Sequence, residues 1–317
     1  MGSLYQRLEH GISVIDTDFG RPHFAASYLV VENGSAAFVD TGPNHAVPRL
    51  LAALEQHGLA RDSVEWVIAT HVHLDHAGGV GALMRELPAA RLVIHPRGAR
   101  HMIDPTQLSE GVRAVYGAEV ATRDYGELIP VPADRIVTTS DAMTIELAGR
   151  PLHIIHTPGH AKHHHCIWDE RSQGWFTGDT FGIAYPELAT PNGPYILPTT
   201  TPTQFDPETL HTSVSRLLER RPKAMYLTHY GPITDPDALS VVLLRQVDAM
   251  AEAARTHAFD PERHARLKEA LTSLYLSEQR RLHTTVSTDR QLQLLAGDIE
   301  LNAQGLEVWL DAANRQR

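Results

Sequence analysis

The sequence lacks several features that would place it in a familiar class of protein. It has one cysteine, Cys166, which excludes an internal disulfide framework and fits a reducing, cytoplasmic compartment. Lys and Arg number 28 against 38 Asp and Glu, and the net charge of −10 argues against a nucleic-acid partner. Residues 1–16 contain no apolar signal-peptide core and no apolar run approaches the length of a membrane span, so no membrane partner is expected. Without a G-x-S-x-G motif, serine hydrolase chemistry has no support.

Histidine, by contrast, is abundant, with 20 copies among 317 residues. The densest cluster is THVHLDHAGG, which follows an apolar run (VEWVIA) that predicts a buried strand. Side chains two apart on a strand share a face, so His71 and His73 are expected to point the same way. Asp75 and His76 follow in the expected turn. One such cluster is also consistent with a polar loop, so the decision depends on ligands elsewhere in the chain.

The pattern of apolar runs predicts a layered α/β domain. Two strands joined by the turn ENGS form a hairpin, and strands then alternate with helices. The expected strands of this half are Ile12–Asp16, Ser27–Val31, Ala36–Asp40, Val64–Ala69 and Arg91–His95, with helices at His45–His57 and after the glycines at 78–81. Periodicity weakens over residues 96–132, which suggests a rim or lid over a site, with short helices at 98–103 and 109–116.

The second half continues the strands and ends in helices. Strands are expected at 136–138, 143–147 and 152–156. The stretches HTPGHAKHHHCIWD and GWFTGDTFG are each expected to contain a strand joined to a polar turn, and a last strand is expected at 224–228 after a helix over 207–220. Residues 181–203 are expected to form a long loop. Helical spacing predicts three blocks over 237–257, 261–282 and 288–314. We therefore expect a core domain of residues 1–236 and a helical extension of residues 237–317. The apolar stripes of the extension pack on the core or form a homodimer contact.

Seven candidate metal ligands share one property: each comes just past the end of a short apolar strand. They are His71, His73, Asp75, His76, His160, Asp179 and His229. Strand ends can converge on one edge of a sheet, where loops carry function over a rigid scaffold. Two imidazoles with a third His and a carboxylate complete one four-ligand site, and Asp75 and His76 with another His and a shared carboxylate complete a second.

Five ordered motifs carry a resemblance to a known family: VDTG, THVHLDH, TPGH, TGD and THYG. Over residues 10–232 the chain resembles the metallo-β-lactamase superfamily, in its glyoxalase II-like hydrolase branch. The resemblance implies an α/β fold, a four-layer αββα sandwich with its site at one edge of the two sheets. It also implies that His71, His73 and His160 hold one metal, that Asp75, His76 and His229 hold a second, and that Asp179 bridges them.

The same resemblance implies a chemistry. Two divalent metal ions, zinc first with iron or manganese as alternatives, would hold a hydroxide that attacks a small ester, thioester or lactone, with Asp75 steering it. Two departures stand out. The last motif of the family is usually Gly-His-Gly, whereas Thr228 and Tyr230 flank His229 here. The second departure is the stretch HHHC that comes after TPGH, and its first histidine, His163, is expected to face solvent.

Other candidates have both a functional and a plain structural interpretation. Asp40 resembles the family's buried carboxylate that orients a ligand, and a simple turn residue is the alternative. His164 is expected to support the ligand loop or touch substrate. Tyr185 and Tyr195 are candidates for a hydrogen bond to a developing oxyanion, with packing as the alternative. Tyr230, next to His229, is a candidate because it would bring a phenol near the site.

Two other functions remain open from the sequence. One is iron-dependent oxygen or persulfide chemistry on the same fold, against which the complete second ligand set speaks. The other is a binding or regulatory protein with little turnover, against which the retention of every ligand speaks. The substrate itself cannot be read from the motifs, because many chemistries share this fold and ligand set.

Overall fold

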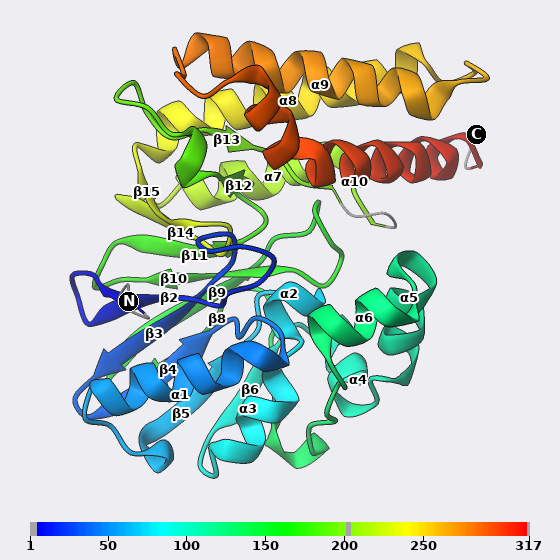
Figure 1. Cartoon of the computed structure of the whole chain (residues 1–317). Helices are drawn as coiled ribbons and strands as arrows, with labels where there is room; N and C mark the ends of the chain where they lie inside the picture. The colour runs from blue at the N-terminus through cyan, green and yellow to red at the C-terminus, as the bar shows by residue number, and fades with distance from the viewer. Residues whose placement is uncertain (1–4, 201–203, 316–317) are drawn as a thin grey trace. The chain divides into compact units, whose positions relative to one another are not determined.

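The computed structural model describes residues 5–200 and 204–315 (Figure 1). The chain forms two compact units, each assembled from separate segments. The first unit consists of residues 1–156, 163–178 and 222–232, and the second of residues 157–162, 179–221 and 233–317. The expected boundary between residues 236 and 237 stays a prediction. Among the described residues, no helix has both the length and the apolar content that a membrane span requires.

The first unit is built around two sheets. The strands of the first sheet lie in chain order and are antiparallel from β1 to β4 and parallel from β4 to β7. They are β1 Tyr5–Arg7, β2 Ile12–Asp16, β3 Ala26–Glu32, β4 Ser35–Val39, β5 Val64–Ile68, β6 Arg91–Ile94 and β7 Ile136–Thr138. The second sheet has the order β15-β14-β11-β10-β9-β8. Its strands are β8 Met143–Leu147, β9 Arg150–His156, β10 His165–Asp169, β11 Gly174–Gly178, β14 Ala224–Leu227 and β15 Gly231–Thr234.

Strand alternation divides the apolar residues between two cores. In β4, Ala36 and Phe38 face a core shared with helices, while Ala37 and Val39 face a core shared with the second sheet. Because both faces of the first sheet are covered at its centre, the strands β3 and β4 are buried along most of their length. The helices on its outer face include α1 Val47–Gln56 and α3 Val80–Glu86 (Figure 1).

The stretch from residue 96 to residue 132 is more regular than its sequence indicates. It contains α4 Pro96–Ile103, α5 Thr106–Tyr116 and α6 Ala118–Tyr125, of which the last was not expected. A further short helix, α2 Leu74–Ala77, carries Asp75 and His76, which were expected in a turn. The remaining short elements are the 3-10 turns η1 Asn44–Ala46, η2 Arg61–Ser63, η3 Ala133–Arg135 and η4 Pro186–Leu188.

The second unit is mainly helical. Its helices are α7 Pro207–Leu218, α8 Pro236–Thr256, α9 Arg263–Arg281 and α10 Thr288–Arg315, and a two-stranded ribbon pairs β12 Ile183–Ala184 with β13 Ile196–Leu197. In α8 the residues Leu239, Leu243, Val247 and Met250 are buried at helical spacing, which gives the apolar stripe that the sequence shows. Helices α8, α9 and α10 lie side by side (Figure 1).

Candidate metal centre

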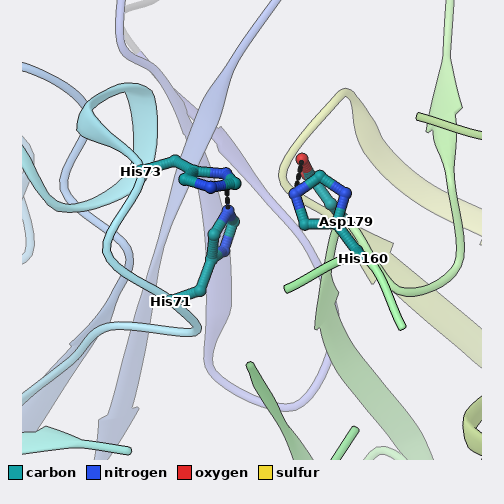
Figure 2. A group of neighbouring side chains, drawn as sticks. All are labelled: His71, His73, His160 and Asp179. Carbon is teal, nitrogen blue, oxygen red and sulfur yellow. Dashed lines mark hydrogen bonds and ion pairs between the residues drawn. The ribbon is translucent and has the colours of Figure 1, made fainter. Parts of the chain in front are cut away.

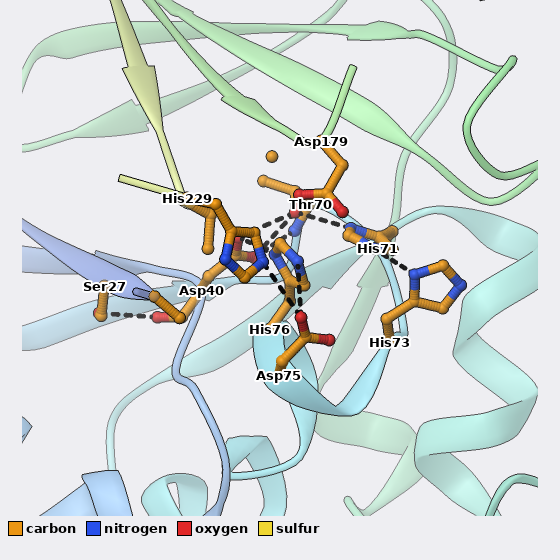
Figure 3. A network of polar contacts seen from close by, with 12 residues as sticks. Ser27, Asp40, Thr70, His71, His73, Asp75, His76, Asp179 and His229 are labelled. Atoms are coloured by element: carbon orange, nitrogen blue, oxygen red, sulfur yellow. Dashed lines mark hydrogen bonds and ion pairs between the residues drawn. The ribbon is translucent and has the colours of Figure 1, made fainter. Parts of the chain in front are cut away.

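Asp40 is the centre of a buried polar network in the first unit. It follows β4 with a backbone φ of 55°, in the left-handed region, and its side chain is fully buried. Its carboxylate accepts hydrogen bonds from the Thr70 backbone N–H at 2.8 Å, the Thr70 hydroxyl at 2.9 Å, His76 Nδ1 at 2.9 Å and the Thr228 hydroxyl at 2.7 Å. Figure 3 shows this carboxylate surrounded by donors. A buried carboxylate satisfied in this way fixes the orientation of every group that contacts it.

The network determines which nitrogen of His76 carries the proton. An ionised carboxylate only accepts hydrogen bonds, so His76 Nδ1 must be the donor to Asp40. The lone pair of the neutral ring is then on Nε2. The same reasoning applies to His71: the Thr70 hydroxyl gives its single hydrogen to Asp40, so it can only accept from His71 Nδ1, which lies 3.1 Å away. Asp40 therefore orders two imidazoles, one directly and one through Thr70.

His76 forms a group with Asp75 and His229, and the three ligand atoms lie within 4.8 Å of one another. His229 Nδ1 lies 2.7 Å from the Phe24 carbonyl oxygen, to which it donates, and its Nε2 lies 3.1 Å from Asp75 Oδ2. The same Asp75 oxygen lies 3.6 Å from His76 Nε2. Asp75 is the partly exposed member of this group, with 23% of its side chain accessible, while the two imidazoles are buried.

A second group consists of His71, His73, His160 and Asp179, whose ligand atoms also lie within 4.8 Å of one another. His71 Nε2 and His73 Nδ1 are 2.8 Å apart, and His160 Nε2 and Asp179 Oδ2 are 3.3 Å apart (Figure 2). His160 Nδ1 lies 3.1 Å from the Thr199 carbonyl oxygen, so Nδ1 is the donor and Nε2 is the ring nitrogen that faces the carboxylate. The bridging role assigned to Asp179 stays a prediction.

The donor set fits divalent cations. Four imidazoles, those of His71, His76, His160 and His229, have their Nδ1 hydrogen bonded in a way that leaves Nε2 as the ligand atom. Metal-ligating histidines are held in this manner, through the second ring nitrogen. Donor atoms around a tetrahedral zinc at about 2.0–2.1 Å lie about 3.4 Å apart, which is close to the separations within both groups. No thiolate is present to favour a soft metal, so zinc, iron and manganese all suit the set.

The HHHC stretch that follows the TPGH motif surrounds the ligands. The His164 ring stacks on the His71 ring with centroids 4.8 Å apart, and it is fully buried. Its role in supporting the ligand loop or touching substrate stays a prediction. His163 was expected to face solvent, and this expectation is wrong: it is only 7% exposed, because its ring packs 5.6 Å from the His73 ring. His165 points to the other side of β10, toward Thr139.

That side contains a cluster of three imidazoles outside the ligand groups, of which His95 and His165 are buried and His156 is half-buried. The Thr139 hydroxyl lies 3.1 Å from both His156 Nε2 and His165 Nδ1, and the His95 and His156 rings are 4.2 Å apart. Burial, assisted by His95 and His156, lowers the pKa of His165 to about 3. Burial and His156 lower the pKa of His95 to about 4. Both rings are therefore neutral at physiological pH. No local sequence pattern connects these three histidines, because they lie on different strands or at their ends.

The three tyrosine candidates have well-defined surroundings. The Tyr185 hydroxyl donates to Asp298 Oδ2 at 2.6 Å, and Tyr195 is fully buried. Tyr230 packs its ring 5.1 Å from His23, and burial raises the pKa of its phenol, which therefore stays protonated. None of the three is in either ligand group. Their contribution to substrate binding stays a prediction.

Comparison with known proteins gives a consistent family. The family model described as the metallo-beta-lactamase superfamily matches residues 20–229. A metallo-beta-lactamase fold-containing protein of Sulfurisphaera tokodaii is 24% identical over 229 residues, which are 71% of this chain and 79% of that protein. A hydroxyacylglutathione hydrolase of Stenotrophomonas maltophilia is 30% identical over 160 residues, 50% of this chain and 47% of its own length. An atrochrysone carboxyl ACP thioesterase of Aspergillus fumigatus is 26% identical over 155 residues, 49% of this chain and 39% of its own length. The chain thus matches less than half the length of the last two.

Solved structures show the same fold. The crystal structure of a metallo-beta-lactamase family protein from Thermus thermophilus superposes with a TM-score of 0.67 at 20% identity, covering 96% of this chain and 94% of that chain. At this identity the likeness concerns the fold alone. The αββα fold class that the family resemblance implies is confirmed by the family match and by this structure.

Proposed function

The chain belongs to the metallo-beta-lactamase superfamily, and from this premise we propose that it is a dinuclear metal-dependent hydrolase of a small ester, thioester or lactone. The observation that carries the proposal is the set of four imidazoles whose Nδ1 atoms are engaged, so that each Nε2 is a ligand atom. A polar loop without a metal has no reason to hold four rings in one tautomer. Metal ligands do, because only a deprotonated nitrogen coordinates.

The ligands divide between two ions. His71, His73 and His160 would hold the first, and Asp75, His76 and His229 the second, with Asp179 shared between them. Zinc is the metal that we expect, and iron and manganese are the alternatives. When bound, such ions supply a nucleophile at neutral pH, because they lower the pKa of a coordinated water from about 15.7 to about 7.

Asp75 is the residue that we assign to direct the nucleophile. Its Oδ2 lies toward His76 and His229, while part of its side chain is accessible to solvent. We assign Oδ1 to accept a hydrogen bond from the attacking water, which would hold one water lone pair toward the substrate carbonyl.

Thioesters are the substrate class to test first. Two relatives are named for such chemistry: a hydrolase of hydroxyacylglutathione and an acyl-carrier-protein thioesterase. The residues that bind glutathione in glyoxalase II cannot be matched in this sequence, so the acyl and thiol parts are left to experiment. Lactones and simple esters remain in the proposal because the same attack on a carbonyl carbon cleaves them.

The test combines elemental analysis with a substrate panel. Full-length protein prepared without chelator should contain close to two metals per chain and hydrolyse at least one thioester, ester or lactone. His229→Gln should lose one metal and most of the activity, whereas His45→Gln, a change at an exposed histidine, should retain both. One metal per chain with full activity would contradict the dinuclear site. Two irons with oxygen consumption and no hydrolysis would support the alternative oxygen chemistry instead.

A further inference from the structure

His160 depends for its orientation on a segment that has no regular secondary structure. Its Nδ1 donates to the Thr199 carbonyl oxygen at 3.1 Å. Thr199 is in the short stretch Pro198–Thr200, which follows β13 and belongs to no helix or strand. A carbonyl in such a stretch points in a fixed direction only if neighbouring residues are held by other groups. Those groups come from the C-terminal helices.

Asn302 of α10 holds the segment on both sides of Thr199. Its Oδ1 accepts from the Thr200 backbone N–H at 2.7 Å, and its Nδ2 donates to the Pro198 carbonyl at 3.1 Å. Asn302 is 1% exposed, so these bonds are shielded from water. The Thr200 hydroxyl adds a bond to the Leu301 carbonyl at 3.3 Å. The peptide groups before and after Thr199 are thereby fixed to one helix.

The amide of Asn302 has a defined orientation. Its Nδ2 also lies 2.6 Å from the Tyr275 hydroxyl oxygen in α9, and that hydroxyl lies 3.7 Å from Met250 Sδ, a weak acceptor, in α8. The tyrosine hydrogen is thus directed to the sulfur, and its oxygen accepts from Asn302. All three C-terminal helices take part in this chain of contacts, which ends at the Thr199 carbonyl.

A second contact from α10 supports the same region. Asp298, one turn before Asn302 and on the same face of the helix, accepts from the Tyr185 hydroxyl at 2.6 Å. Tyr185 follows β12, a few residues after Asp179, whose Oδ2 lies 3.3 Å from His160 Nε2. Helix α10 therefore contacts the chain both near Asp179 and next to the carbonyl that orients His160.

We propose that Asn302 is a positioning residue for the metal ligand His160. It acts through Pro198 and Thr200 on the Thr199 carbonyl, and this carbonyl keeps the proton of His160 on Nδ1 and its Nε2 toward the metal. The inference rests on the metal site proposed above. It gives the C-terminal helices a defined task in metal binding, beyond covering apolar surface. Loss of such outer contacts typically weakens metal affinity in proteins by about 10–100-fold.

The experiment compares two buried amides of the same helical extension. Gln246 of α8 is fully buried and donates from Nε2 to the Ile196 carbonyl at 2.9 Å, just before the Pro198–Thr200 segment. Asn302→Ala and Gln246→Ala each remove one buried amide that bonds to the backbone of this region. Full-length zinc-loaded proteins are mixed with a chromogenic chelator, and the release of each zinc is followed, together with the melting temperature.

The expected result is selective. In Asn302→Ala one of the two zinc-release phases should accelerate by about tenfold or more, while the other phase stays as in the wild type. Gln246→Ala should lower the melting temperature comparably without changing either phase. If Asn302→Ala does not fold, Asn302→Ser, which can keep only one of the two backbone bonds, must accelerate one release phase and leave the other as in the wild type.

Two outcomes overturn the inference: release rates in the Asn302 variants equal to wild type, or equal acceleration in Gln246→Ala. A wild-type chain that takes up no zinc is a different failure, because it removes the proposed function itself.

Discussion

Replacing Asp40 by Asn tests whether the buried carboxylate controls the metal ligands. The carboxylate accepts from donors on Thr70, His76 and Thr228 and donates to none. An amide in its place has one oxygen and one NH₂ group, and the NH₂ group must face at least one of these donors. The ring that can adapt is His76, which can move its proton to Nε2 and accept at Nδ1. In that tautomer Nε2 no longer has a lone pair for a metal.

The size of the effect follows from these contacts. Loss of an outer carboxylate that orders a ligand should weaken the metal held by Asp75, His76 and His229 by about 10–100-fold, which is about 1.4–2.7 kcal/mol. Loss of charge-assisted hydrogen bonds should lower the free energy of unfolding by about 1.5–3 kcal/mol. The first quantity is measured by chelator competition at fixed pH, and the second by urea unfolding.

Asp169→Asn is the matched control. Asp169 is also fully buried, with Arg150 Nε at 2.8 Å from its Oδ1 and the Ser172 N–H at 3.0 Å from its Oδ2, but it contacts no candidate ligand. It should be destabilised comparably while both metals bind as in the wild type. If Asp40→Asn binds both metals with wild-type affinity, or if Asp169→Asn loses one equally, the tautomer argument is refuted.

Three further predictions follow from other parts of the structure. Asp179→Ala should damage the second metal most and lower turnover by about two orders of magnitude or more, because Asp179 is assigned to both metals; wild-type turnover in that variant would remove the bridging role. Truncation after Pro236 removes α8–α10 and should cause aggregation or altered substrate preference, because these helices contain the buried residues Leu243, Val247, Leu271 and Leu295. A soluble, monomeric and kinetically unchanged product would mark the helices as a separate module. Acid should destabilise the fold through His165, whose pKa is about 3 in the folded chain and 6.5 in the unfolded chain. Between these two values the unfolded chain binds a proton that the folded chain does not bind. The free energy of unfolding is therefore full above pH 6.5 and falls as the pH drops from 6.5 toward about 3, by at most about 1.4 kcal/mol per pH unit. Urea unfolding of metal-free protein between pH 7.5 and 4.5 should show a smaller slope for His165→Phe than for wild type, and equal slopes would contradict this contribution.

The sequence by itself determined the features that depend on local periodicity. The three C-terminal helices were expected at 237–257, 261–282 and 288–314 and are found at 236–256, 263–281 and 288–315, because their apolar residues recur at helical spacing. The hairpin of β3 and β4 was expected from the turn ENGS between two apolar runs. The motif residues were found in the same way, since each follows a strand that can be recognised locally. Residues 96–132 were less well predicted because their helices span only 8, 11 and 8 residues, too short for a repeating apolar pattern to stand out, and α6 was missed.

Only the tertiary structure decided how the candidate ligands are oriented. His229 donates to the carbonyl of Phe24, 205 residues away, and Asp40 accepts from Thr228, 188 residues away. The carbonyl that orients His160 belongs to Thr199, and Asn302, which fixes its neighbours, is more than 100 residues further along the chain. Every residue has a backbone carbonyl, so no residue type marks the one that a histidine will contact. The choice is made when packing brings distant segments together and each buried polar group must find a partner.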